Sequence, residues 1–410
     1  MLRIDVQNAR SGMTLALPVM HPETPEQTLL RVGYELTEPT LRRLRQMQVQ
    51  TLWVDYPGLE HLRRFINPET VERDTVVMQQ VEETFTLMQQ ESAAKLRYEE
   101  YTATIESLVE SLLNNPEAAL YMSDIFGAGG TLMRHSASVM YLCLMMGLKL
   151  EGYLVRERKH VPAGRAREVV NLGMGAMLHD VGVTQLAEAV RLRYEQTGDD
   201  SDPLWREHPA LGFRAVRGRV EPTAATVVLH HHQLANGKGY AGADFPVLSE
   251  SGIHPFARIA AVADFFDRLH RPIGMPEQPP VWVLGAMLSE PVKSRFDEQV
   301  LRALVEVVPP YPPGSRVKLS NGVCGVVVDY VSSDPCRPKV QVMPDFDDLD
   351  SSASDKPATG GGSGDGGLGE IISLADESPH VQVVECNGVG VAEFNFPPSK
   401  VPGSLVSAPG

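Results

Sequence analysis

Apolar segments with helical spacing dominate the sequence from about Tyr121 to Val308, and histidines and aspartates are embedded in them. The clearest segments are HSASVMYLCLMMGLKL, VVNLGMGAMLHDVGV, TAATVVLHHH, ARIAAVADFFDRL and VWVLGAMLSE. Such segments pack as a bundle, because apolar side chains at helical spacing form a face that must be buried. Nine of the twelve histidines lie between His135 and His270. We therefore expect a mainly α fold whose helical core, 121–308, carries the chemistry.

The sequence on both sides of this core follows other patterns. Alternating runs near Leu2 and Thr51 flank the helical stretch LTEPTLRRLRQM, which predicts a small α/β module. After the prolines of PPYPP, which end helix formation, SRVKLSNGVCGVVVDYV predicts a small β unit. The expected divisions are an α/β module at 1–65, a helical linker at 66–120, the helical core at 121–308, a β unit at 309–348, a disordered linker rich in Gly, Ser and Asp at 350–369, and short strands with a tail at 370–410.

The 66–120 region is polar and rich in glutamate, with apolar residues at helical spacing in VVMQQVEETFTLM and TIESLVESLL. These patterns predict long amphipathic helices. The helices either connect the module to the core or pair with a second copy of the chain, so a homodimer through 66–120 is one expectation.

Charge and cysteine content restrict the partners and the compartment. A formal charge of −15 argues against a general nucleic-acid-binding surface, because such binding needs cations that displace counterions from phosphates. A small phosphorylated ligand stays compatible with this charge. The four cysteines lack CxxC spacing, and the sequence has neither a secretory leader nor the run of about 18 apolar residues that crosses a bilayer. We expect a cytoplasmic protein without a membrane or polymeric nucleic-acid partner.

Histidines and aspartates of the apolar segments are the candidate functional residues. They are His135, His179, Asp180, His208, His230, His231, His232 and Asp264. Metal sites in helical bundles use side chains of facing helices, so their ligands lie far apart in the sequence. Imidazole with carboxylate suits zinc, manganese or iron(II), and two bridged ions can activate water for a phosphoryl displacement. We predict a metal site for phosphoester hydrolysis, with His179 and Asp180 as catalytic residues.

Each of these residues also has a structural interpretation. A buried histidine is commonly a hydrogen-bonded core residue, and the histidine triplet could be a solvated helix face. Asp264 in AAVADFF is the most informative, because an ionised carboxylate on an apolar helix is costly unless it is paired or bound to a metal. Its alternative partners are Arg258 and Arg268, which are nearby in the sequence.

The loop at 236–240, NGKGY, offers backbone amides, a cation and an aromatic ring. Such a loop can approach phosphates and stack on a base. Asn-Gly is also a turn dipeptide, so the loop has a structural interpretation too. We predict Lys238, Gly239 and Tyr240 as substrate-binding residues.

In this arrangement the region from about His135 to Val308 resembles the HD-GYP family, a branch of the HD phosphohydrolases that hydrolyses the bacterial second messenger cyclic di-GMP. AMLHDVG resembles the family's HD segment, HPALG its His-Pro-x-x-Gly, HHQLANGKGY its His-His-Glu with Asp-Gly-x-Gly-Tyr-Pro, and AVADFFDRL its last aspartate helix. All four appear in the family's order. The resemblance implies an HD-type helical bundle in a bacterial signalling protein.

The resemblance also implies a role for individual residues. Counting back from Gly237 and Gly239 places the histidine pair at His231 and His232, which leaves His230 as a bystander. Two divalent ions are implied, iron or manganese in preference to zinc. The implied ligands are His135, His179, Asp180 and Asp264 for one ion, and Asp180, His208, His231 and His232 for the other. Arg271 is implied to contact the substrate.

The sequence departs from the family's pattern around the substrate. The replacements are Val183 for a lysine that contacts a substrate phosphate, Asn236 for aspartate, Ala241 for proline, Gln233 for glutamate, and Ile273-Gly274 for tyrosine followed by a cationic residue. Thr131 stands where some members carry a glutamate for a third metal, which favours two ions. Losing one phosphate contact removes about 1.5–3 kcal/mol, unless Lys238 or Arg134 compensates.

Three functions are therefore compared. The first is a metal-dependent phosphodiesterase that hydrolyses cyclic di-GMP to linear pGpG and further to GMP. The second is a catalytically impaired relative that binds metal and nucleotide, or a protein partner, as a scaffold. The third is an HD hydrolase for another phosphorylated compound, such as a different cyclic dinucleotide.

Overall fold

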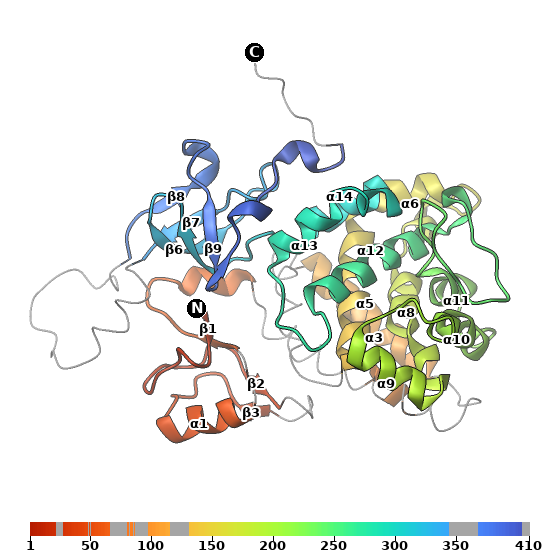
Figure 1. Ribbon diagram of the computed structural model, residues 1–410, viewed down its shortest axis with the longest axis horizontal. Helices are drawn as coiled ribbons and strands as arrows, with labels where there is room; N and C mark the ends of the chain where they lie inside the picture. Colours follow the sequence, from red (N-terminus) through yellow and green to blue (C-terminus); the bar gives the residue numbers. More distant parts are fainter. Residues whose placement is uncertain are drawn as a thin grey trace, which may run out of the picture.

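The fold was analysed in a computed structural model of the chain (Figure 1). The structure describes residues 1–21, 28–47, 49, 51–65, 80–81, 83–84, 86, 97–114, 131–343 and 368–403. The predicted linkers at 66–120 and 350–369 lie largely outside these ranges. Their predicted helical and disordered character therefore stays a prediction, except for helix α3, at Tyr98–Asn114, and the helical residues at 80–81, 83–84 and 86.

A helical bundle forms the largest part of the structure, which confirms the mainly α fold. Its apolar segments form α5, α8, α11 and α12, whose buried side chains share one core. Proline at the start of α11 and α12 marks two of the helix beginnings, because its fixed φ suits the first turn. The bundle helices after α3 are α5 Thr131–Lys149, α6 Glu151–Glu157, α7 Ala163–Ala166, α8 Val170–Leu178, α9 Glu188–Thr197, α10 His208–Val216, α11 Pro222–His230, α12 Pro255–His270, α13 Pro280–Met287 and α14 Glu298–Val307.

The N-terminal residues form the predicted small α/β module. Strand β1, Leu2–Asp5, pairs antiparallel with β4, Thr51–Val54, and α1, Glu38–Gln46, lies between them in the sequence. A second pair, β2 at Val19–Met20 and β3 at Thr28–Leu30, was not predicted. Its strands are too short to give a period of two that could be read from sequence.

The C-terminal strands form one antiparallel sheet rather than two separate pieces. Its strand order is β10-β9-β5-β6-β7-β8, with bounds β5 Arg316–Leu319, β6 Cys324–Asp329, β7 Lys339–Val342, β8 Ile371–Ser373, β9 Val383–Cys386 and β10 Val389–Gly390. Strand β9 pairs with β5, and β8 pairs with β7. The later strands therefore cover both edges of the predicted β unit, and each edge would otherwise present unpaired backbone groups.

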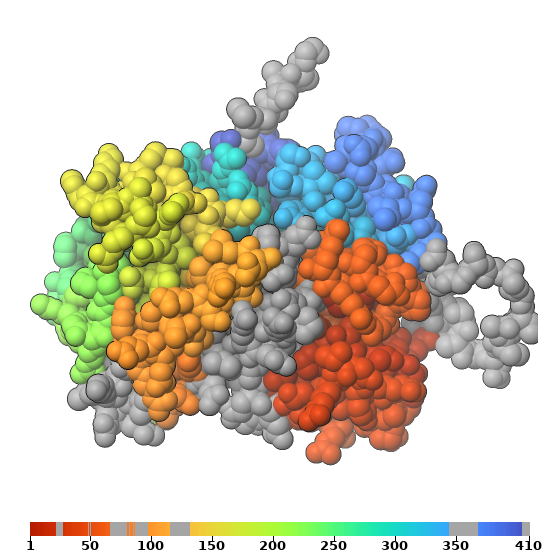
Figure 2. All heavy atoms as spheres, turned by 180° about the vertical axis from the view of Figure 1, so that it is seen from behind, coloured from red at the N-terminus to blue at the C-terminus, as the bar shows by residue number. Residues whose placement is uncertain are grey.

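Strand β6, in the middle of this sheet, is buried on both faces, which explains its apolar run CGVVVD. Val326 and Val328 belong to the core of the N-terminal module, whereas Val327 belongs to the core of the helical bundle. Successive side chains of a strand point to opposite faces, so one strand contributes to two cores. In both views the sheet and the N-terminal module occupy one half of the molecule and the helical bundle the other half (Figures 1 and 2).

Two expectations from composition can be compared with the structure. Within the described ranges, no single helix is long and apolar enough to span a membrane, although α5 and α6 pass that test as a pair bent by 83°. All four cysteines lie in described parts of the chain, are buried, and form no disulfide. The expectation of a thiol-preserving compartment stays a prediction.

Candidate metal centre

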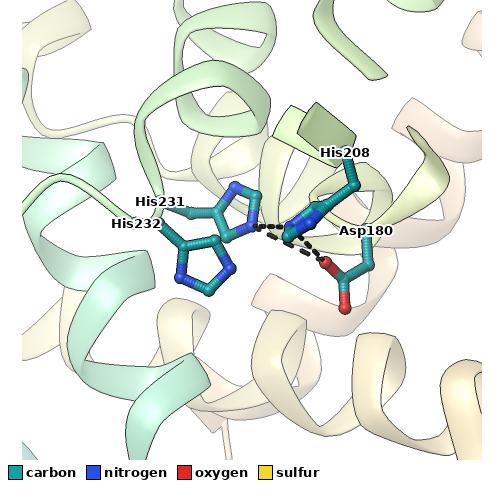
Figure 3. A group of neighbouring side chains, drawn as sticks. All are labelled: Asp180, His208, His231 and His232. Atoms are coloured by element: carbon teal, nitrogen blue, oxygen red, sulfur yellow. Dashed lines mark hydrogen bonds and ion pairs between the residues drawn. The ribbon is translucent and has the colours of Figure 1, made fainter. Parts of the chain in front are cut away.

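Several of the predicted histidines lie at helix ends, whereas His135 lies within α5. His179 directly follows α8, His208 is the first residue of α10, and His231 directly follows α11. Asp180 lies between α8 and the short 3-10 helix η3, Val181–Gln185. Because these ends meet, side chains far apart in sequence lie in one buried cluster (Figure 3).

A close backbone approach brings Asp180 to His208. A Cβ atom on Gly182 would lie 2.0 Å from the carbonyl oxygen of His208 and 2.5 Å from the amide nitrogen of Gly212. Only glycine therefore lets η3 pack against α10 at this distance. The glycines of HDVG and HPALG meet each other here, and Asp180 Oδ1 reaches 3.2 Å from His208 Nε2.

Backbone carbonyls fix the orientation of three imidazoles. The Nδ1 atoms of His179, His208 and His231 each donate to the carbonyl three residues earlier, at 2.7, 2.8 and 2.8 Å respectively. A carbonyl only accepts, so Nδ1 carries the hydrogen, and in the neutral ring Nε2 is left with a lone pair. Metal-binding histidines are commonly oriented by the same kind of bond.

We call His208, His231, His232 and Asp180 Oδ1 the His208 set. The Nε2 atoms of His208 and His231 lie 3.2 Å apart, and they lie 3.2 and 3.6 Å from Asp180 Oδ1. Burial lowers the pKa of both histidines, although Asp180 opposes this effect. When both imidazoles are neutral, neither Nε2 atom carries a hydrogen, so the two atoms cannot form a hydrogen bond with each other.

Two atoms of the His208 set have no hydrogen-bond partner among the described residues. They are Asp180 Oδ1 and His232 Nε2, and both are buried. Burial lowers the pKa of His232 well below its usual range. The four side chains each offer one ligand atom within 4.8 Å of the others. Donor chemistry and orphaned atoms both fit a divalent cation at this position.

We call His135, His179, Asp264 and Asp180 Oδ2 the His135 set. His135 Nε2 lies 2.9 Å from Asp264 Oδ1 and 3.2 Å from His179 Nε2. Burial and the charge of Arg268 lower the pKa of His135, but hydrogen bonds to Asp264 and Asp267 outweigh them and raise it to about 9. His135 is thus paired with carboxylates on both ring nitrogens.

Arg268 forms hydrogen bonds with both carboxylates of the His135 set. Its Nε donates to Asp264 Oδ1 at 2.7 Å, and one terminal nitrogen donates to Asp180 Oδ2 at 2.9 Å. The other terminal nitrogen donates to the hydroxyl of Tyr194. Burial raises the pKa of both aspartates, but other interactions outweigh it and hold both values well below the usual range. They come from His179 and Arg268 for Asp180, and from Arg268 and His135 for Asp264. The sequence pointed to Arg268 only as an alternative partner of Asp264.

Asp267 was missed by the sequence reasoning. Its Oδ2 lies 2.7 Å from His135 Nδ1, and its Oδ1 accepts from Ser138 at 2.6 Å and from Arg271 at 2.6 Å. Its position three residues after Asp264 on one helix could have indicated a shared face. Arg271 also binds Glu277, and its side chain is only 6% exposed. The expected contact of Arg271 with substrate stays a prediction.

The 236–240 loop supports His232. A Cβ atom on Gly239 would lie 2.3 Å from the carbonyl oxygen of His232, so glycine is required for this packing. The ring of Tyr240 stacks on His232 with centroids 4.6 Å apart, and its hydroxyl is buried without a partner in the described structure. Lys238 is exposed. The loop thus contacts the cluster through His232, and its role in binding substrate stays a prediction.

The replaced positions are part of the local packing. Val183 packs with Leu186, Val190 and Trp205 in a small apolar cluster. The Gln233 amide donates to the carbonyl of Pro246 at 3.0 Å and accepts from the Leu248 amide at 3.0 Å. His230 belongs to neither candidate group of metal ligands among the described residues, and its role as a bystander stays a prediction.

Known proteins resemble this chain over part of its length. Residues 159–300 match the HD domain family. The cyclic di-GMP phosphodiesterase PA4108 of Pseudomonas aeruginosa is 27% identical over 247 residues, which cover 58% of this chain and 54% of that protein. The cyclic di-GMP phosphodiesterase response regulator RpfG of Xanthomonas campestris is 30% identical over 144 residues, which cover 34% of this chain and 36% of that protein. The chain thus spans about half and about a third of the length of these relatives.

A solved structure also resembles the chain. Bd1817, an HDG"Y"P protein from Bdellovibrio bacteriovorus, aligns with a TM-score of 0.43 and 16% identity, covering 74% of this chain and 97% of that one. The match to the HD domain and the two sequence relatives confirm the resemblance predicted from the motifs.

Proposed function

We propose that this chain, which carries an HD domain and resembles the HD-GYP family, is a metal-dependent phosphohydrolase that hydrolyses cyclic di-GMP. The observation that carries the proposal is the His208 set. Its facing lone pairs and its orphaned carboxylate oxygen favour a divalent cation, and the sequence relatives are named as cyclic di-GMP phosphodiesterases.

His208, His231, His232 and Asp180 would hold this ion, which we expect to be manganese or iron in preference to zinc. Such an ion supplies Lewis acidity and lowers the pKa of a water molecule. Hydrolysis adds one water across a P–O bond, so it opens the cyclic dinucleotide to linear pGpG, and a second water yields two GMP molecules. His179 lies beside Asp180, with Nε2 and Oδ2 3.6 Å apart, and its catalytic role in this proposal is to keep Asp180 in position.

The partly exposed side of the cluster indicates where a phosphate would approach. The side chains of His179, His208 and His231 are 0% exposed, whereas those of His232 and Arg268 are 12% and 23% exposed. A phosphate that enters from this side meets a guanidinium with N–H groups still able to donate. Lys238 and Tyr240 lie on the loop that borders His232, which supports a role for them in substrate binding.

The scaffold function is the second candidate, and a specific observation favours it. The lysine of the family is replaced by Val183, which is buried in an apolar cluster, and Arg271 is already bound to Asp267 and Glu277. One expected phosphate contact is therefore lost, because valine replaces the lysine. The other, Arg271, already forms ion pairs within the protein. A scaffold would bind metal and nucleotide without turnover.

The test is incubation of protein of measured manganese or iron content with cyclic di-GMP, followed by chromatography for pGpG and GMP. We expect linear product from the metal-loaded protein and none after chelation. A His208→Ala variant that folds but lacks metal is the matched control. Absence of product from fully loaded protein, together with retained nucleotide binding, would favour the scaffold. A panel of other cyclic dinucleotides separates the third function.

A further inference from the structure

The two ligand sets differ in how their carboxylate oxygens are used. Asp180 shares its two oxygens between them: Oδ1 belongs to the His208 set, and Oδ2 to the His135 set. Oδ1 has no hydrogen-bond partner within the described residues, but Oδ2 accepts from Arg268 at 2.9 Å. Asp264 Oδ1, the other carboxylate oxygen facing His135 and His179, accepts from the Nε of Arg268 at 2.7 Å.

We propose that Arg268 replaces the metal ion at the His135 set, so that the chain binds one divalent ion, at the His208 set, instead of two. This inference rests on the proposed metal site. It assigns the guanidinium a positioning role as a permanent cation that holds Asp180 and Asp264 together.

Charge supports this assignment. A guanidinium cannot lose its proton in a protein, so it stays positive at any working pH. A divalent ion bound to Asp180 Oδ2 and Asp264 Oδ1 would lie beside the guanidinium that already binds both oxygens. Two cations at such a distance repel strongly in a buried site, where water screens them little. One cation, not two, therefore fits these oxygens.

Three contacts hold Arg268 in place. Besides the two aspartates, its remaining terminal nitrogen donates to the Tyr194 hydroxyl. The Tyr194 ring stacks on Trp205 at 3.6 Å between centroids and 8° between planes. The carbonyl of Trp205 in turn accepts from His208 Nδ1 at 2.8 Å. Arg268 is thus held by Tyr194, which stacks on Trp205, and the backbone of Trp205 orients His208 in the His208 set.

The His208 set lacks any such cation. No arginine or lysine forms an ion pair with Asp180 Oδ1 among the residues that the structure describes, and His232 Nε2 is likewise without a partner there. Two buried polar atoms without partners are costly, and an ion bound to both removes the cost. Among the described parts of the chain, the ligand atoms of the cluster that lack a compensating cation therefore belong to the His208 set.

The experiment measures manganese per chain in the full-length protein after chelation, reloading and desalting, by mass spectrometry, with electron paramagnetic resonance to separate single ions from coupled pairs. We expect one uncoupled ion in the wild type. Arg268→Ala removes the cation and opens space, so it should bind two coupled ions. Arg268→Lys keeps a positive charge and should still bind one.

Arg258→Ala is the matched control. Arg258 lies on the same helix, is buried, and pairs with Asp297 at 3.1 Å away from the cluster, so its loss should leave one ion per chain. Two ions in the wild type, or one in a folded Arg268→Ala, would overturn the inference. If Arg268→Ala does not fold, the wild-type stoichiometry and its resonance spectrum still decide. Absence of any bound ion in the wild type would instead overturn the proposed function.

Discussion

The His208 set and the His135 set contain the same kinds of side chain, yet their electrostatic environments differ. In the His208 set, neutral imidazoles face one another across a carboxylate oxygen that has no partner in the described structure. In the His135 set, carboxylates bind an arginine and a histidine whose pKa is raised. The comparison teaches that a complete ligand motif identifies the residues of a site but not which positions take an ion.

Removal of Asp180 should have the largest effect, because it belongs to both sets. Asp180→Ala should abolish metal binding and lower the free energy of unfolding by about 3–5 kcal/mol, since Arg268 loses a buried partner. Metal analysis and urea unfolding measure the two effects. Asp297→Ala, which breaks the buried pair with Arg258 elsewhere, should destabilise the protein but keep its metal. Full metal content in Asp180→Ala would contradict the assignment of Asp180 to the metal-binding His208 set.

A pair of histidine variants should sharpen the comparison next. We expect His208→Ala to lose the bound ion, because it removes one of four ligands from a buried set. His135→Ala should keep the ion, because Arg268 already neutralises the carboxylates near it. Metal content of both folded variants is the measurement. Equal loss in the two variants would show that the sets act as one site.

Lowering the pH should have a smaller effect on the stability of the protein. It acts on α12, the helix that carries Asp264 and Arg268. The N-terminus of α12 is capped by His254, whose Nδ1 accepts from the Phe256 amide at 3.2 Å. Burial lowers the pKa of His254 from 6.5 to about 4. The charged and titratable groups that face His254 are Arg158, Glu221, Arg258 and His230.

The sign follows from the direction of the shift. Between pH 6.5 and about 4 the unfolded chain binds a proton at His254 that the folded chain does not, so stability falls as the pH is lowered through this window. We expect a loss of about 2 kcal/mol, discounted for partial exposure of the ring. Urea unfolding of metal-free protein at several pH values measures it. His254→Asn keeps a capping acceptor without a titrating ring and should flatten this part of the profile. An unchanged profile in that variant would rule out His254 as the source.

Several features of the site were predictable from the sequence. His179, Asp180, His208 and His231 stand at the ends of apolar segments, and helix ends of a bundle can converge on one point. The departure at Val183 was visible as well. What the sequence could not supply is the distance between α12 and η3, on which the contact of Arg268 with Asp180 depends.

The fold shows the same limit. Helices α5, α8, α11, α12 and α13 follow from local periodicity, and the segments that predicted them have nearly the observed bounds. The shorter or more polar helices, such as α6, α7 and α9, were not predicted. The union of β5 to β7 with β8 to β10 depends on pairing between strands separated by 344–367. Such non-local pairing leaves no local pattern. The run CGVVVD indicated a buried strand, but only the structure gives the two cores that Val326 and Val327 enter.

The bonds from Nδ1 to backbone carbonyls have a consequence for how this protein can evolve. A carbonyl is present whatever side chain its residue bears, so no single substitution at Ala176, Trp205 or Val228 deletes the acceptor that orients His179, His208 or His231. His135 instead depends on the side chain of Asp267, which one nucleotide change can remove. Neutral substitutions can thus change the environment of His135, while the orientations of His179, His208 and His231 are kept by the backbone.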